Sequence, residues 1–141
     1  MRELTRGDLT EIGLLNAEEY EKNKKLIPLL KSWWWLCSPG AYNNNAAYVF
    51  ADGDIYPDGY FVYKEAWVRP ALTLNPALAA ELKPGDQLSL GSHTATYIGA
   101  DKCLLDQCIA KHIYDTTSNS WHNSELKTYM ASEEFIALLF D

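Results

Sequence analysis

Residues 33–40 read WWWLCSPG and residues 67–72 read WVRPAL, and these two segments frame the most informative part of the 141-residue sequence. Between them lie short aromatic segments and loops that are rich in asparagine, tyrosine, aspartate and glycine. The apolar segments predict a stiff frame, and loops on a rigid frame are the usual carriers of function. The arrangement therefore predicts a recognition surface.

The tryptophan run has no helical period and is followed by a Ser-Pro-Gly turn signal, so Trp33–Cys37 is predicted to be a strand. Side chains alternate between the faces of a strand, which places Trp34 and Leu36 on one face and Trp33 and Trp35 on the other. Both faces then need cover, or one face is an aromatic interaction surface. Because tryptophan is mostly buried, the core interpretation is favoured.

Strands and turns are predicted to follow one another from this run to Leu74. Pro57-Asp58-Gly59 has the composition of a turn, and Pro70 is expected to restrict the last strand to an edge or a bulge. The predicted strands are Ala47–Ala51, Asp54–Tyr56, Tyr60–Lys64 and Val68–Leu74, with a tight turn at Asp52-Gly53 between the first two.

Helices are predicted on either side of this region. Asn16 and Glu19 have the spacing of a capping box, which begins a helix from Ala17 to about Lys24 with Tyr20 facing the core. Towards the C-terminus, an amphipathic helix is expected over Asn123–Met130, with Asn123 as its N-cap. Ser132 is expected to cap a last, strongly apolar helix, and Met1–Gly7 is expected to be a loose arm.

Residues 75–109 are predicted to contain one helical turn within Asn75–Leu82 and a hairpin. The hairpin joins Gln87–Leu90 to Thr94–Ile98. Lys102–Ile109 has the pattern of a third strand, although its apolar residues also fit a helical stripe. These elements predict an α+β domain in which short antiparallel strands are flanked by two or three helices.

Composition excludes several classes of function. The net charge of −7 argues against a surface that neutralises phosphates, so no direct contact with nucleic acid is expected. An odd number of cysteines and no signal peptide predict reduced thiols in a cytoplasmic setting. No apolar run has the length of a membrane span, and no metal-binding spacing occurs, so neither a membrane partner nor a cofactor is expected.

Catalytic chemistry has little support in the sequence. No Ser-His-Asp, P-loop or dinucleotide motif occurs, and we expect no enzyme activity. Asp52, Asp54 and Asp58 raise the alternative of a calcium site, but their spacing lacks a regular ligand ladder. Asp-Gly pairs are first of all turn formers, so turn chemistry is the favoured interpretation.

The framing segments resemble an uncharacterised domain that is frequent in Gram-positive gut bacteria and their phages. Its signature runs approximately W-W-L-R-S-P-G, A-x-x-V-x-x-D-G and G-V-R-P-A-L. The matching residues here are Trp34–Gly40, Ala46–Val49 with Asp52-Gly53, and Trp67–Leu72. Cys37 stands where the family has arginine, and Trp67 stands where it has glycine. The resemblance implies a C-type-lectin-like fold, similar to the formylglycine-generating-enzyme group and to the variable proteins of diversity-generating retroelements.

The C-terminal residues also resemble this family, but in a different order. Trp121, Ser124, Leu126 and Phe135 look like a W-x-x-S-x-L element that precedes the tryptophan motif in the family. The single domain, residues 1–141, is therefore interpreted as a circular permutation, in which 85–141 correspond to the family's first half and 9–74 to its second half. The same order also fits a domain-swapped dimer. Either arrangement places Asp141 near Leu9.

The candidate binding residues lie in the loops between the framing segments. Tyrosine supplies large contact area at low entropic cost and asparagine supplies adaptable hydrogen bonds. Such a cluster indicates a non-enzymatic module that recognises a protein or glycan, although turn-forming asparagines and sheet-covering tyrosines explain it equally well. Two alternatives remain: a small acidic phage-encoded inhibitor of a host defence enzyme, and an assembly domain that forms a homodimer. The candidates are Tyr42, Asn43, Asn44, Asn45, Tyr56, Asp58 and Tyr60.

Overall fold

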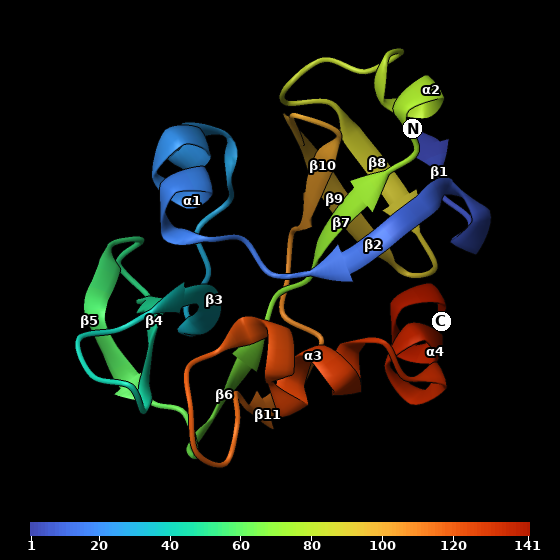
Figure 1. Ribbon diagram of the computed structural model, residues 1–141. Coiled ribbons are helices and arrows are strands. Elements are labelled where there is room, and N and C mark those ends of the chain that lie inside the picture. The colour runs from blue at the N-terminus through green and yellow to red at the C-terminus, as the bar shows by residue number, and fades with distance from the viewer.

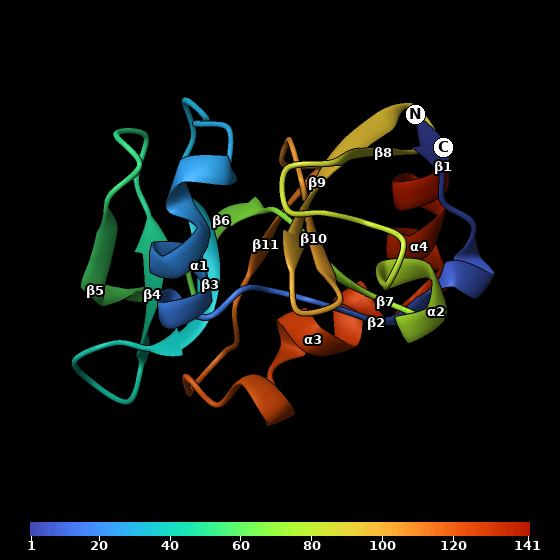
Figure 2. The ribbon, with the colours of Figure 1, turned by 90° about the horizontal axis from the view of Figure 1, so that it is seen from above.

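The computed structural model describes all residues from Met1 to Asp141 and contains two β-sheets with short helices around them (Figure 1). The six-stranded sheet has the order β1-β8-β9-β10-β7-β2 and the five-stranded sheet has the order β11-β6-β3-β4-β5. Viewed from above, the two sheets lie side by side, with β3–β5 on one side and β7–β10 on the other (Figure 2). The coarse α+β expectation is therefore confirmed.

The strands are short, as the sequence predicts. In the six-stranded sheet they are β1 (Arg2–Glu3), β8 (Gln87–Leu90), β9 (His93–Gly99), β10 (Lys102–Leu105), β7 (Ala71–Leu74) and β2 (Leu9–Gly13). In the five-stranded sheet they are β11 (Ala110–Ile113), β6 (Glu65–Val68), β3 (Trp34–Pro39), β4 (Asn45–Val49) and β5 (Ile55–Phe61).

The helices are α1 (Ala17–Asn23), α2 (Pro76–Ala79), α3 (Glu125–Met130) and α4 (Glu133–Phe140), with 3₁₀ turns at Arg6–Asp8, Lys24–Leu26 and Trp121–Asn123. The capping box that begins α1 is confirmed, because Asn16 Oδ1 accepts from Glu19 N at 2.7 Å and Glu19 Oε1 accepts from Asn16 N at 2.9 Å. Ser132 caps α4 as expected. The N-cap of α3 is Ser124 and not Asn123. Ser124 Oγ accepts from Lys127 N at 3.1 Å, whereas Asn123 belongs to the preceding 3₁₀ turn.

The tryptophan run is a core strand, and alternation along it is confirmed. Trp34 is 1% exposed and packs with α1 and with residues of both sheets, whereas Trp35 is fully buried in a second cluster with residues of α3 and α4. Trp34 pairs with Trp67 in the parallel β3–β6 ladder, so the two framing segments are neighbours. Tyr20 from α1 meets the Trp34 ring edge-on at 5.5 Å.

The predicted strand Val68–Leu74 is wrong in one important respect. The chain forms β6, leaves the five-stranded sheet at Arg69-Pro70, and continues as β7 in the interior of the six-stranded sheet. Pro70 thus lies between two strands and confines neither of them to an edge. A proline cannot donate to a ladder, and here it stands where the chain changes sheets.

Arg69 is buried at this crossing, with 1% of its surface exposed. Its Nε donates to the carbonyl of Leu105 at 2.6 Å, and its guanidinium lies 5.0 Å from the centre of the Trp34 ring. No carboxylate forms an ion pair with it, and Nη2 has no hydrogen-bond partner. Burial lowers the pKa of Arg69 to about 10, although nearby Cys108 and Asp106 oppose this change.

Three further expectations are corrected. The N-terminal arm is not loose: β1 pairs with β8, and Leu4 is buried. The predicted strand Lys102–Ile109 ends at Leu105, and the polar strand β11 that follows it was not foreseen. Helix is excluded there, since β10 pairs with both β7 and β9.

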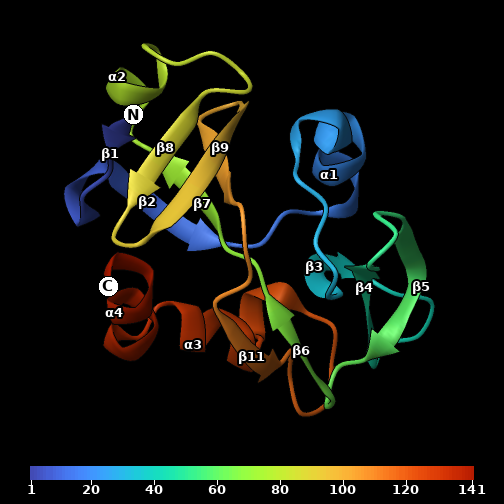
Figure 3. The ribbon, with the colours of Figure 1, turned by 180° about the vertical axis from the view of Figure 1, so that it is seen from behind.

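The hairpin of β8 and β9 is confirmed, and it contacts both ends of the chain (Figure 3). The amide of Leu4 donates to Ser89 O at 2.7 Å, and the amide of Ser92 donates to Asp141 O at 2.7 Å. No helix of the structure combines the length and the apolar character that crossing a bilayer requires.

Candidate functional site

The candidate site lies on the outer strands of the five-stranded sheet, where β3, β4 and β5 are antiparallel neighbours. Register places Tyr48 opposite both Trp35 and Tyr56, and places Tyr60 opposite Ala46. Trp33, just before β3, packs on the same face as Trp35. Helices α3 and α4 cover this face of the sheet at Trp35. Towards β4 and β5 the same face continues as an aromatic surface.

Seven rings form this surface, which we call the aromatic strip. Trp33 lies at its centre, with ring centroids 5.0 Å from Tyr48 and 4.9 Å from Tyr60. Tyr48 stacks on Tyr56 at 5.1 Å, and Tyr60 lies 6.0 Å from Phe61. Aromatic pairs prefer such edge-on and offset contacts. The strip consists of Phe50, Tyr56, Tyr48, Trp33, Tyr60, Phe61 and Tyr63.

The ends of the strip are open to solvent and its centre is half-buried. Phe50 and Tyr56 are each 40% exposed, while Phe61 is 43% and Tyr63 is 47% exposed. Burial raises the pKa of Tyr48, so its hydroxyl remains protonated at neutral pH and can donate a hydrogen bond. The strip thus offers contiguous apolar area with hydroxyl groups on a rigid sheet.

A bulge in β5 brings the two predicted tyrosines together. The expected turn at Pro57-Asp58-Gly59 is wrong, because these residues remain within β5 and lie opposite the single residue Ala47. Gly59 has a φ of +88°, and a Cβ at this position would lie 2.6 Å from Ala46 O. Only glycine accommodates both conditions, and the bulge lets Tyr56 and Tyr60 reach Tyr48 from the same face.

The asparagine loop borders this sheet. Tyr42 is 71% exposed, Asn43 is exposed and Asn44 is half-buried, in keeping with their role as candidates. Asn45 differs: it is the first residue of β4, it is buried, and its Oδ1 has no hydrogen-bond partner. Its side chain therefore belongs to the interior and not to the exposed part of the loop.

Asn119 holds the loop in place from a distant part of the sequence. Its Nδ2 donates to Tyr42 O at 3.0 Å and to Asn45 O at 3.1 Å, and its own amide donates to Asn43 O at 2.9 Å. The segment that carries Asn119 is ordered by Asp115, whose carboxylate accepts from several backbone amides. Although burial acts in the opposite direction, these hydrogen bonds lower the pKa of Asp115.

The aspartates of this region form hydrogen bonds with the backbone and an ion pair at the surface. Asp52 Oδ1 accepts from Asp54 N at 2.9 Å, as the turn interpretation predicts, and Asp54 pairs with Lys24 at 3.0 Å. Asp58 is exposed on the bulge, and its carbonyl accepts from Ala41 N at 2.8 Å, which joins bulge and asparagine loop. No three His, Cys, Asp or Glu side chains come together as metal ligands.

The thiols are poor nucleophiles in this environment. Burial raises the pKa of Cys37 to about 11, and it raises the pKa values of Cys103 and Cys108 to about 12. All three therefore remain protonated at neutral pH, whereas catalytic cysteines react as thiolates. The cysteines are free and form no disulfide.

The structure thus brings together part of the predicted set. Tyr56 and Tyr60 share the strip, while the exposed residues of the asparagine loop adjoin the Asp58 bulge. The candidate binding residues chosen from the sequence did not include Trp33, Phe50, Phe61 or Asn119, although Trp33 lies on a strand face that was considered as an aromatic interaction surface. Phe61 follows Tyr60 directly and Phe50 lies two residues after Tyr48, which was a signal for these two, whereas no local pattern pointed to Asn119.

Fold and site define a small two-sheet α+β protein with an exposed aromatic sheet face. Residues 6–76, which make up half of the 141-residue chain, match a family described as a domain of unknown function (DUF6273), and the chain belongs to that family. The matched segment contains β2, α1 and every strand of the aromatic strip. Comparisons with curated proteins and with solved structures found no match.

Proposed function

We propose that this protein is a non-enzymatic binding module that holds a protein or glycan ligand against the aromatic strip. The observation that carries the proposal is the continuity of the seven rings, four of which are at least 40% exposed at the ends of the strip. A contiguous exposed apolar patch marks an interaction site, whereas isolated surface apolar residues do not. The asparagine loop and Asp58 supply hydrogen-bonding groups at its border.

Rigidity supports the same proposal. The rings stand on paired strands, and the half-buried Trp33 and Tyr60 connect the exposed rings to the fully buried Trp35. A preformed surface loses little conformational entropy when a ligand binds, which favours affinity. The raised pKa values of the cysteines support a role without covalent catalysis.

The finer fold assignment is part of the proposal. A C-type-lectin-like arrangement of phage or gut-bacterial origin, acting in the bacterial cytoplasm or on a virion, is supported by the adjacency of the two framing segments in the β3–β6 ladder. That adjacency leaves the intervening strands free to present their side chains to a ligand. The permuted order of the family elements remains a prediction of the sequence.

The test removes two exposed rings and leaves the core intact. The double variant Tyr56→Ser, Phe61→Ser is expected to reduce binding at least tenfold on a glycan array and in crosslinking capture from bacterial extract. Because each ring is only about 40% exposed, its burial by a ligand contributes roughly 0.6–1.2 kcal/mol, so the two rings together correspond to about tenfold in affinity. The matched control is Leu29→Ser, which removes an apolar side chain of 66% exposure outside the strip.

Circular dichroism and the unfolding midpoint must be the same in both variants for the comparison to hold. Binding that survives the loss of both rings, or that falls equally in Leu29→Ser, would reject the aromatic strip as the site. Absence of any captured protein or glycan for the wild type would reject the proposed function itself.

A further inference from the structure

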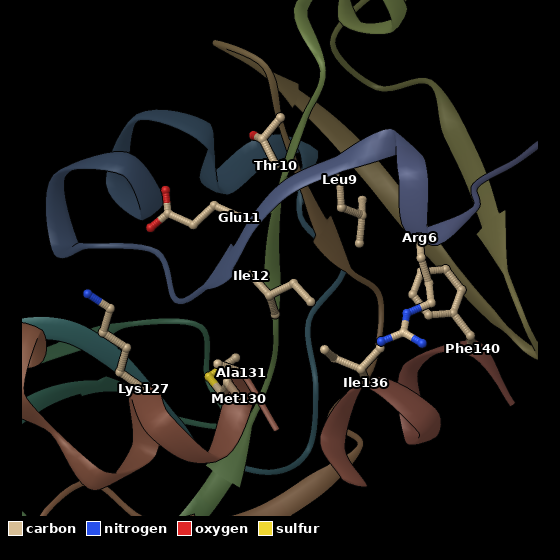
Figure 4. Close-up of a pocket in the computed structure, with 10 residues that line it drawn as sticks. All are labelled: Arg6, Leu9, Thr10, Glu11, Ile12, Lys127, Met130, Ala131, Ile136 and Phe140. Atoms are coloured by element: carbon tan, nitrogen blue, oxygen red, sulfur yellow. The ribbon is translucent and has the colours of Figure 1, made fainter. Parts of the chain in front are cut away.

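A second concave region lies on the opposite sheet, between β2 and the helices α3 and α4 (Figure 4). It encloses about 450 Å³, within the usual range of roughly 300–1,000 Å³ for ligand sites. We call it the β2 groove. It is lined by Arg6, Leu9, Thr10, Glu11, Ile12, Lys127, Met130, Ala131, Ile136 and Phe140.

One wall of the β2 groove is an unpaired strand edge. β2 is the last strand of the six-stranded sheet and pairs only with β7. No backbone hydrogen bond joins Leu9–Gly13 to α3 or α4, although α3 lies against the strand. At about 3.3 Å per residue, β2 presents roughly 17 Å of edge with unsatisfied backbone groups. An extended peptide is the ligand that satisfies such groups in register.

The floor of the groove is apolar. Ile12 from the strand and Met130 from α3 face each other across it, and Ile136 and Phe140 of α4 continue the surface (Figure 4). Met130 is fully buried, while Ile12 and Ile136 remain partly exposed towards the groove. A strand that pairs with β2 would direct alternate side chains onto this floor.

Charge distribution indicates what else the ligand carries. Arg6 is already paired with Glu133 at 2.9 Å. Lys127 forms no ion pair with a carboxylate, and its Nζ lies 3.3 Å from His122 Nδ1. Glu11 also lacks a salt bridge and lies at the same end of the groove as Lys127 (Figure 4). An acidic side chain of the ligand would neutralise Lys127, and Glu11 would oppose it.

We propose that the β2 groove binds an extended peptide segment of a partner protein, which adds a strand to β2, places apolar side chains at alternate positions on the groove floor and brings an acidic residue to Lys127. Main-chain pairing supplies affinity and the floor supplies specificity in this mode of recognition. The site is separate from the aromatic strip, which belongs to the other sheet.

The probe is a displayed library of random seven-residue peptides, from which binders are selected on the immobilised full-length chain. Soluble Ala131→Trp protein is added as a competitor, so that peptides that bind outside the groove are removed. Ala131 is exposed and lines the groove, so tryptophan at this position fills it without disturbing the core. The matched control is Ala137→Trp, on the exposed surface of α4 outside the groove. Selected peptides are expected to alternate apolar and polar residues and to carry one acid.

Fluorescence anisotropy with one selected peptide then tests the details. Ala131→Trp is expected to weaken binding at least tenfold and Ala137→Trp to leave it unchanged. Lys127→Gln is expected to weaken binding several-fold and Glu11→Gln to strengthen it, since the two charges act on the ligand acid with opposite sign. Methylation of alternate peptide amides is expected to abolish binding, because it removes the donors for β2.

Several results would overturn the proposal. They are a library from which no peptide is enriched over the Ala131→Trp competitor, equal affinity of the methylated peptide, or equal affinity of the Ala131→Trp protein. Concentration-dependent dimerisation in sedimentation that Ala131→Trp abolishes would assign the groove to a second copy of this chain and would likewise overturn a peptide partner.

Discussion

Arg69 provides the sharpest test of the energetics of the fold, through the substitution Arg69→Met. Methionine has a similar length and can fill the same space beside Trp34 without a charge. The variant removes a cation that is buried at the sheet crossing without a carboxylate partner.

The expected change follows from opposing contributions. Burial lowers the pKa of Arg69 to about 10, and this decrease corresponds to a cost of about 3 kcal/mol for burying the charge. The charge-assisted hydrogen bond to Leu105 O contributes about 2 kcal/mol in the other direction. The contact with the Trp34 ring contributes about 2 kcal/mol more. Arg69→Met is therefore expected to destabilise the protein by only about 1 kcal/mol.

Urea unfolding followed by tryptophan fluorescence measures this difference. Arg69→Lys is the informative comparison, because it retains the buried charge and loses the planar guanidinium; it is expected to destabilise by about 3 kcal/mol. Breaking a true buried ion pair costs about 3–5 kcal/mol. A loss of that size in Arg69→Met would refute the reasoning and would mean that Arg69 has a charged partner.

Two further predictions concern stability. Burial raises the pKa of Cys103 to about 12, so the thiol ionises in the unfolded state first as the pH rises above 9.0. The free energy of unfolding of the wild type should therefore decrease by about 1.4 kcal/mol per pH unit from this group between about pH 9.5 and about pH 10.5. Cys103→Ala should lack that part of the slope in urea titrations, and equal slopes would contradict the assignment. Gly59→Ala should destabilise at least twice as much as Gly85→Ala in thermal unfolding, because both glycines have positive φ but only at Gly59 would a Cβ meet backbone, 2.6 Å from Ala46 O. Equal losses would show that backbone strain alone matters.

The predictions that the structure confirms depend on residues that are close to one another in the sequence. The capping box at Asn16 and Glu19 involves neighbours along the chain, and the alternation of Trp34 and Trp35 follows from the geometry of any strand. The hairpin of β8 and β9 is set by its own turn. These features need no knowledge of distant segments, and the structure confirms them.

Features that depend on contacts between distant segments of the chain could not be predicted from such local patterns. The change of sheet at Arg69-Pro70 depends on which strands lie on either side, and β11 acquires its strand character only by pairing with β6. Pro57-Asp58-Gly59 has the composition of both a turn and a bulge, and only the partner strand β4 distinguishes them. Asn119 acts on the asparagine loop from another part of the chain, so the site could be predicted only in part.

The pairing of β2 with β7 has a consequence for biosynthesis. Leu9 pairs with Leu74 and Arg2 pairs with Leu88, so strands made early by the ribosome must wait for partners made much later. The entropic cost of closing such long loops arises before the stabilising contacts between the strands form. Folding is therefore slow compared with that of helical bundles of equal size. The six-stranded sheet is consequently completed late in translation, and nascent chains should depend on chaperone protection until β10 has emerged.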